Sequence, residues 1–236
     1  LVLEEDDFYI YDGDDPNLPM WMVFIDGSNT YFQISTNACV AALNGKIVSG
    51  GNASNDRLRV IDFLLDNEIE FTHSSGRRTT LNPISDRNGS ITFGPYYNNL
   101  TYISRPYQTS LSGLRDRYIN AVAMTLLPNA PIDADTGLSI PTIAVGTDSG
   151  VAVIKDDGSV VDIYRTNDDD VHHVDFDGDR VIMFMELGGV YVAKIPAGDQ
   201  SGNPNSAWSV YGSFSGNTSG VNYPAVQAQG SGADIV

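Results

Sequence analysis

The stretch TIAVGTDSGVAVIKDDGSVVDIY, residues 142–164, decides the fold class. Its three short apolar runs are separated by the polar segments TDSG and KDDG. Gly and Asp at such positions supply the backbone angles that tight hairpin turns need. The stretch therefore predicts three antiparallel strands joined by short turns.

The same unit recurs along the chain. Residues 43–71 and 177–196 repeat the order of polar turn, apolar strand, Gly-containing turn and second strand. Further copies are expected at residues 7–35 and 89–104. A period of roughly 40–50 residues with three or four short strands is typical of a β-propeller blade. We expect an all-β protein of about four to five such blades, forming a complete β-propeller or a sector of one.

The apolar patterns predict how deeply each strand is buried. PTIAV (141–145), GVAVI (150–154) and RVIMFM (180–185) are apolar at successive positions, so both of their faces should be covered. SVVDIY (159–164) and LRVID (58–62) mix polar and apolar residues and are expected as outer strands with one solvated face.

Three segments fit the repeat less well. Residues 57–71 also show helical spacing of apolar residues, but the repeat favours two strands with a turn at Asp66 and Asn67. Residues 109–124 could hold a helical turn before a strand, and this alternative stays open. Residues 127–141, which contain three prolines, are predicted to form a surface loop that interrupts a blade.

The domain boundary follows a change in composition. Residues 1–197 are assigned to the propeller blades. Residues 198–236 are rich in Gly, Ser and Asn, with a strand expected at 207–214, and form either a final blade or a linker to a following domain. The first residues, LVLEEDD, show neither an initiator Met nor a signal-peptide pattern, so a processed or partial chain is expected.

Charge excludes one class of partner. The chain carries 30 Asp and Glu against 13 Lys and Arg, a formal net charge of -17. Such a surface repels phosphate backbones, so attractive binding to nucleic acid is not expected. No apolar run is long enough to span a membrane.

The metal candidates lie in one acidic hairpin. Asp175, Asp177 and Asp179 have the spacing of the first ligands of an EF-hand loop, but Arg180 stands where that loop requires Gly. A strand after this turn would carry Glu186 about 20 Å away. We expect an ordinary hairpin turn, with Ca²⁺ contact by the three Asp side chains as the alternative.

No catalytic or cofactor-binding constellation is predicted. The sequence holds no GxSxG motif and no catalytic-Cys context, and His172 and His173 would point to opposite faces of a strand. The group Tyr96, Tyr97 and Tyr102, set among Asn and Thr, is the interface candidate, since exposed Tyr suits either a protein interface or glycan stacking.

The segments PTIAVGTDSGVAVIKDDGSVVDIY (141–164) and VHHVDFDGDRVIMFM (171–185) resemble propeller repeats in tail and fibre proteins of tailed bacteriophages. The resemblance is good over residues 141–194, weaker over 7–104 and absent after 196. It implies a non-enzymatic structural protein of the virion: a tail nozzle, adaptor or fibre component that docks to copies of itself and to other tail proteins and serves host attachment. In such a tail, an acidic channel wall would let DNA slide past.

Two other classes remain open. One is a secreted, sialidase-like or lectin-like propeller, a glycosidase or glycan-binding module located outside the cell or in the periplasm. The other is a bacterial surface or periplasmic scaffold. The enzyme or lectin class predicts Asp, Glu, Arg and Tyr at a central channel, whereas the assembly class predicts large apolar contacts between copies.

Overall fold

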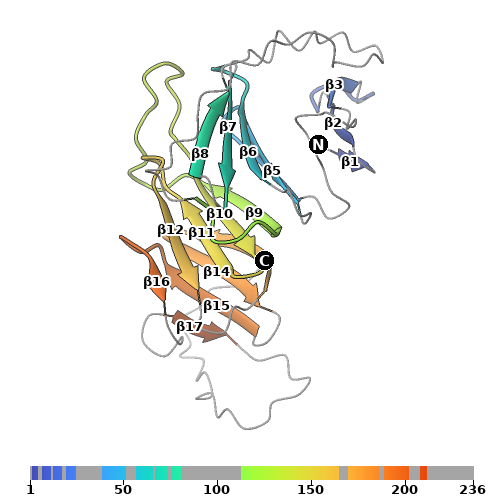
Figure 1. Cartoon of the computed structure of the whole chain (residues 1–236). Coiled ribbons are helices and arrows are strands. Elements are labelled where there is room, and N and C mark those ends of the chain that lie inside the picture. The colour runs from blue at the N-terminus through green and yellow to red at the C-terminus, as the bar shows by residue number, and fades with distance from the viewer. Residues whose placement is uncertain are drawn as a thin grey trace.

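Four sheets make up the described part of the protein (Figure 1). The computed structural model describes residues 2–4, 7–11, 13–17, 20–24, 39–51, 57–65, 67–73, 76–80, 113–164, 170–185, 189–201 and 208–211. These residues are all-β and include no helix, and so none that is long and apolar enough to cross a membrane. Within them the sheets do not close into a ring or a barrel.

The strands follow one another as meanders. The first sheet holds β1 (Val2–Glu4), β2 (Asp7–Tyr11) and β3 (Met20–Phe24). The second holds β4 (Cys39–Leu43), β5 (Lys46–Gly50), β6 (Leu58–Asp62), β7 (Asn67–Thr72) and β8 (Gly76–Thr80). The third holds β9 (Ile119–Thr125), β10 (Thr142–Thr147), β11 (Gly150–Ile154), β12 (Val160–Tyr164) and β16 (Gln200–Ser201). The fourth holds β13 (Val171–Asp177), β14 (Arg180–Met185), β15 (Gly189–Lys194) and β17 (Trp208–Tyr211).

Turn chemistry explains how the meanders form. In the first hairpin of the second sheet, Asn44 and Gly45 have φ angles of 49° and 73° and connect the paired residues Leu43 and Lys46. Two central residues with positive φ match the right-handed twist of the flanking strands, which is why Asn-Gly is favoured there. All of these pairs are antiparallel; β16 alone, among the described strands, pairs in parallel, with β12.

The second, third and fourth sheets pack face to face through two cores. One core, between the second and third sheets, includes Val48, Ile119 and Val145. The other, between the third and fourth sheets, includes Ala144, Val174 and Met183. The first strands of the three sheets, β4, β9 and β13, lie next to one another in that order. The three sheets therefore form one stack with a repeated arrangement.

Strand β10 lies at the centre of this stack. All six of its residues are buried, with Ile143 and Val145 in one core and Ala144 in the other. Strand β11 is buried along its whole length as well. The prediction that both strands are covered on two faces is confirmed.

Glycines allow the sheets to approach closely. A Cβ at Gly50 would lie 2.7 Å from Cγ2 of Ile119, the first residue of β9. In the next pair of sheets, a Cβ at Gly146 would lie 3.0 Å from Cγ1 of Val171, the first residue of β13. The same small-to-branched contact thus joins the second sheet to the third and the third to the fourth.

Two predictions of burial are wrong. Leu58–Asp62 was expected to have a solvated face, but four of the five residues of β6 are buried, including Ile61 on the face opposite the core residues Leu58 and Val60. Arg180–Met185 was expected to be covered on both faces, but in β14 only Val181, Met183 and Met185 are buried, whereas Phe184 is exposed. The fourth sheet has a neighbouring sheet on one side only among the described residues.

The remaining expectations can be placed along the chain. Residues 58–62 and 67–72 form two strands, as predicted, but the turn residues described between them are 63–65, and Asn67, which was expected in the turn, is the first residue of β7. Asp66 lies outside the described residues. The described part of 109–124 contains strand β9 and no helical turn. Residues 127–141 form the expected surface connection. Strand β17, in the Gly- and Ser-rich segment, pairs with β15 as an outer strand of the fourth sheet.

Candidate functional site

A strap of residues 194–201 crosses from the fourth sheet back to the third. The backbone N–H of Ile195 donates to the carbonyl of Asp179 at 3.0 Å, and Nζ of Lys155 donates to the carbonyl of Ala197 at 2.9 Å. The strap then pairs with β12, Gln200 beside Ile163 and Ser201 beside Tyr164. It thus joins the end of β15 in the fourth sheet to the edge of the third sheet.

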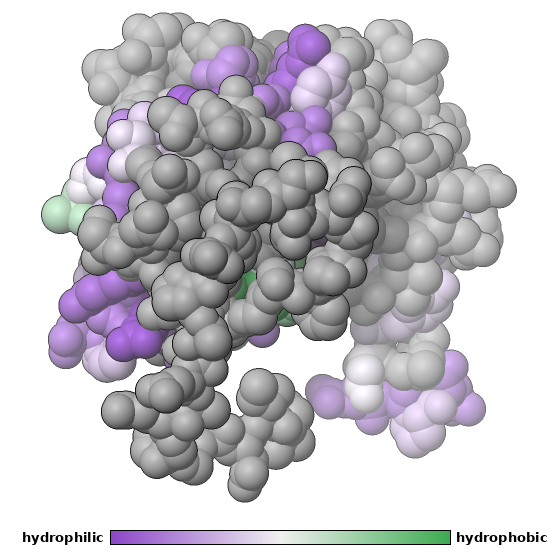
Figure 2. Space-filling view, turned by 90° about the horizontal axis from the view of Figure 1, so that it is seen from below, coloured by the Kyte–Doolittle hydropathy of each residue, from purple (hydrophilic) through white to green (hydrophobic). Residues whose placement is uncertain are grey.

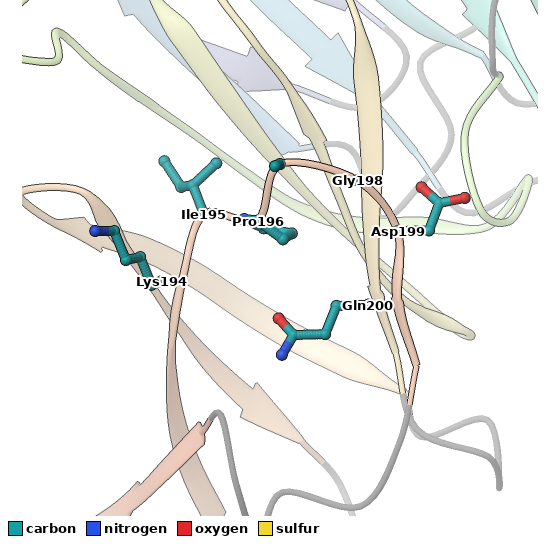
Figure 3. A pocket seen from close by; sticks show the side chains of 7 residues that line it. Lys194, Ile195, Pro196, Gly198, Asp199 and Gln200 are labelled. Carbon is teal, nitrogen blue, oxygen red and sulfur yellow. The ribbon is translucent and has the colours of Figure 1, made fainter.

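The strap borders an open hollow of about 550 Å³, which is lined by residues 194–200 (Figure 3). Lys194 and Asp199 lie at opposite ends of the curve, with Ile195 and Pro196 between them. Binding sites for small molecules usually bring a few polar groups from several elements together in an enclosed pocket. This hollow is open and is formed by one continuous segment, so it does not have the form of a substrate pocket.

Asp162 of β12 is the most perturbed titratable group at the strap. Burial raises its pKa to about 6, and the negative charge of Asp199 adds to this effect, whereas the positive charges of Arg115 and His73 act against it. Its backbone N–H donates to Oδ1 of Asp199 at 3.1 Å. Its own Oδ1 is buried and has no hydrogen-bond partner among the described residues. The surroundings of this carboxyl therefore disfavour its charged form.

The loop before β9 completes the surroundings of Asp162. The N–H of Leu114 donates to the carbonyl of Thr72 at 3.0 Å, which ties the loop to the second sheet. The guanidinium carbon of Arg115 lies 3.9 Å from the centre of the Tyr164 ring, a cation–π contact. Asp162 therefore lies where this loop, strand β12 and the strap meet.

A serine and a carboxylate meet nearby, but not in a nucleophilic arrangement. The Oγ of Ser149 donates to Oδ2 of Asp116 at 2.6 Å. Partial burial acts to raise the pKa of Asp116, but the hydrogen bonds from Ser149, Tyr118 and Arg117 outweigh it, so the pKa lies below its usual value. Such a carboxylate is a poor base. A serine nucleophile needs a base such as His in direct contact.

His73 does not supply that base. Its Nδ1 lies 3.3 Å from the carbonyl oxygen of Leu114, a backbone contact. Because Ser149 contacts Asp116 directly, no histidine stands between the hydroxyl and the carboxylate. The group does not form a Ser-His-Asp triad.

The two carboxylates of the second sheet that are buried among its described residues are paired. Glu70 accepts from Nη1 of Arg57 at 2.8 Å, and Asp62 forms a salt bridge with Lys46. Asp62 also accepts from the backbone N–H groups of Leu64 and Leu65 at 3.0 Å each, which holds the turn between β6 and β7. Buried charges of this kind are paired to offset desolvation, and here the pairing is structural.

The predicted metal candidates lie in the hairpin between β13 and β14. Asp175, Asp177 and Asp179 are all exposed. Oδ2 of Asp179 lies 3.2 Å from Nζ of Lys194, and Oδ1 of Asp175 accepts from the N–H of Phe176. Among the described residues, no three His, Cys, Asp or Glu side chains are arranged to hold a metal ion. Glu186 and the interface candidates Tyr96, Tyr97 and Tyr102 lie outside the described residues.

The outward face of the fourth sheet carries an exposed large apolar side chain. Phe184 is 40% exposed there, and its ring meets that of His173 edge to face, with centroids 5.3 Å apart. Ile182 and Val190 on the same face are half-buried. We call this surface the end face.

The repeat shows how the end face differs from the equivalent faces of the second and third sheets. Phe184 is the fifth residue of β14, and the fifth residues of β5 and β10 are Gly50 and Gly146. At those glycines a branched residue of the following sheet packs against the backbone. In the fourth sheet the Phe184 ring occupies that place, so another sheet cannot pack there in the same way.

Sequence reasoning did not identify Asp162, Asp199 or Phe184. Phe184 had a usable signal, since KIVSG, TIAVG and RVIMF align with Phe in the place of Gly. Asp162 and Asp199 are 37 residues apart, and no pattern in the sequence indicates their contact.

Comparison with protein-family models, with curated proteins and with solved structures finds no match for this chain. Assignment of a function therefore depends on the geometry described above.

Proposed function

We propose that this chain is a non-catalytic structural subunit of a tailed-phage virion: a tail nozzle, adaptor or fibre component built on a sector of a β-propeller. The propeller is supported by the repeated meanders, by the adjacency of β4, β9 and β13, and by the equivalent packing at Gly50 and Gly146. Innermost strands that line up around an axis are a property of propeller blades.

The end face carries the assembly role. Its centre is apolar, with Phe184 exposed between the half-buried Ile182 and Val190, and exposed polar residues of β13 and β14 border it: His173, Asp175 and Arg180. Exposed apolar surface bordered by polar residues marks sites of protein association. In the view from below, hydrophilic residues cover most of the visible described surface, and strongly hydrophobic colour is confined to a small area near the centre (Figure 2). An acidic, mainly hydrophilic exterior keeps such a subunit soluble before assembly.

Self-association provides the test. Sedimentation velocity and electron microscopy should show oligomers of the wild-type chain, and Phe184→Asp should weaken their association by about tenfold or more. The matched control is Leu64→Asp, because Leu64 is 53% exposed but lies in the turn after β6. Far-UV circular dichroism would confirm that each variant is folded.

The location and the rival functions are tested separately. Antibodies against the chain should label the tails of particles from a phage that encodes it. Labelling of a cell envelope or periplasm, turnover of a glycoside, or specific binding on a glycan array would overturn the proposal. So would a wild-type chain that is monomeric alone and with the other tail proteins.

A further inference from the structure

We infer that the connection between β9 and β10, residues 126–141, is a docking element for a partner protein that presents an apolar pocket bordered by Lys and Arg. This inference rests on the proposed assembly function and names the surface and the partner chemistry. We call these residues the insertion hairpin. In Figure 1 they form the long yellow-green loop at the upper left.

The insertion hairpin interrupts the repeat at one place. The equivalent connections in the second and fourth sheets are the two-residue turns Asn44–Gly45 and Gly178–Asp179. Here a much longer segment separates Thr125 from its strand partner Thr142. In repeat architectures, insertions of this kind collect on one face, which is often the binding face.

The insertion hairpin is held in one conformation by its own hydrogen bonds. Ile132 and Ser139 form an isolated antiparallel bridge. The N–H of Asp133 donates to the carbonyl of Leu138 at 2.8 Å, and the N–H of Gly137, whose φ is 72°, donates to the carbonyl of Asp133 at 2.8 Å. A loop that is ordered before binding loses less entropy on association.

A side chain of the second sheet anchors the hairpin. Nδ2 of Asn44 donates to the carbonyl of Ser139 at 2.9 Å. Asn44 belongs to the rigid turn between β4 and β5. The tip is therefore fixed relative to two sheets.

Apolar side chains on this element point to solvent. Ile132 is 61% exposed, Leu126 is 40% exposed and Leu138 is 38% exposed. These three are among the five large apolar residues that are exposed in the described part of the chain. Three exposed apolar side chains on one ordered loop favour an interaction site over singly scattered surface residues.

The charges of the hairpin indicate the chemistry of the partner. Residues 126–141 include Asp133 and Asp135 and no Lys or Arg. Hydrogen bonds from the N–H groups of Asp135 and Thr136 hold the pKa of Asp133 below its usual value, so this carboxylate is charged at neutral pH. The neighbouring Lys46 is already in a salt bridge with Asp62.

Charge also argues against a second copy as the partner. A chain with a formal net charge of -17 presents a repulsive surface to another copy of itself near this acidic tip. Lys or Arg around an apolar pocket of the partner would raise both the rate of association with this acidic tip and the specificity of binding.

Peptide selection tests the inference directly. A random peptide library would be selected on the full wild-type chain and counter-selected on the double variant Ile132→Asp, Leu138→Asp. We expect enriched peptides that combine apolar residues with Lys or Arg. Their affinity, measured by fluorescence anisotropy, should fall at least about tenfold in the double variant, and it should fall as NaCl rises from about 50 to about 500 mM.

The controls separate docking from misfolding. Ile132→Ala keeps the charge unchanged and should weaken binding to a smaller extent, whereas Leu64→Asp, which changes an exposed apolar residue elsewhere, should leave peptide affinity unchanged. Circular dichroism and thermal unfolding would confirm that the variants fold.

Three outcomes would overturn the inference: selection that enriches no peptide, enrichment of peptides without Lys or Arg, or self-association that is lost in the double variant. The first two would leave the proposed assembly function standing if Phe184→Asp still weakened oligomers. If Phe184→Asp left the oligomers unchanged and the double variant left peptide binding unchanged, the proposed assembly function itself would be contradicted.

Discussion

Gly146 shows how a single residue controls the spacing of two sheets. It lies in the fully buried strand β10, and a Cβ there would be 3.0 Å from Val171 Cγ1 and 3.1 Å from the carbonyl oxygen of Val171. A side-chain atom can move aside, but the backbone oxygen belongs to strand β13 and moves only with its sheet. The position therefore requires glycine for reasons of space, since no positive φ is involved.

We predict that Gly146→Ala lowers the free energy of unfolding by about 1–3 kcal/mol, the usual cost of an overpacked core. Urea denaturation monitored by tryptophan fluorescence would measure it. Gly198→Ala is the matched control, because nothing lies within 4 Å of a Cβ at that exposed position. Equal stability of the two variants would show that the third and fourth sheets are less closely packed than described.

The strap and β12 act together as an element that responds to pH. Burial and the charge of Asp199 raise the pKa of Asp162 to about 6, from a usual value of 3.8. The folded protein thus holds this proton more tightly than the unfolded chain does. The contribution of Asp162 to the free energy of unfolding should therefore fall as the pH rises from about 4 to about 6 and should then level off.

We predict that Asp162→Asn removes this contribution, which we place at about 1–2 kcal/mol after allowing for solvent screening of a partly exposed group. Urea denaturation between pH 4 and pH 8 would measure it, and the variant should be the more stable protein above about pH 6. Asp199→Asn is a second probe, because it keeps the Oδ1 acceptor and removes the charge. A carboxyl resonance of Asp162 that titrates at its usual pKa would contradict the account.

The elements differ in how far their sequences predict them. Strands β10 and β11 are predictable because uninterrupted apolar runs lie between clear turn signals, so both period and burial are visible. The burial of Ile61 in β6 is not predictable, because Arg59 on the same face gives the strand the pattern of a solvated face. In β14 every residue after Arg180 is apolar, so the sequence does not distinguish the covered face from the exposed one.

The candidate sites also differ in how far the sequence predicts them. The insertion hairpin is visible in the sequence as a proline-containing interruption of a blade, although its exposed Ile132 and Leu138 are not. The meeting of Asp162 with Asp199 depends on where the chain goes after β15, which is a property of tertiary structure.

At the scale of the whole molecule, net charge is the dominant quantity. A formal charge of -17 on 236 residues produces repulsion across the folded surface that the expanded unfolded chain relieves. We predict that the melting temperature rises with NaCl between about 20 and about 300 mM at pH 7, as the ions screen this repulsion.

Differential scanning fluorimetry would measure the effect. The same titration near pH 4.2, the isoelectric point, serves as the control and should show little dependence on salt. A salt response of equal size at both pH values would mean that repulsion between acidic groups is not its cause.

Because β16 pairs in parallel with β12, the third sheet is completed late in synthesis. The edge of β12 acquires this partner only when residues 200 and 201 have left the ribosome, after the strands β13, β14 and β15 of the fourth sheet. The nascent third sheet thus keeps an open edge while the next sheet forms, and open edges invite pairing with other chains. A product truncated within residues 165–199 would therefore contain an incomplete third sheet that is prone to aggregate. The second sheet takes all of its strands from residues 39–80 and does not depend on later segments in this way.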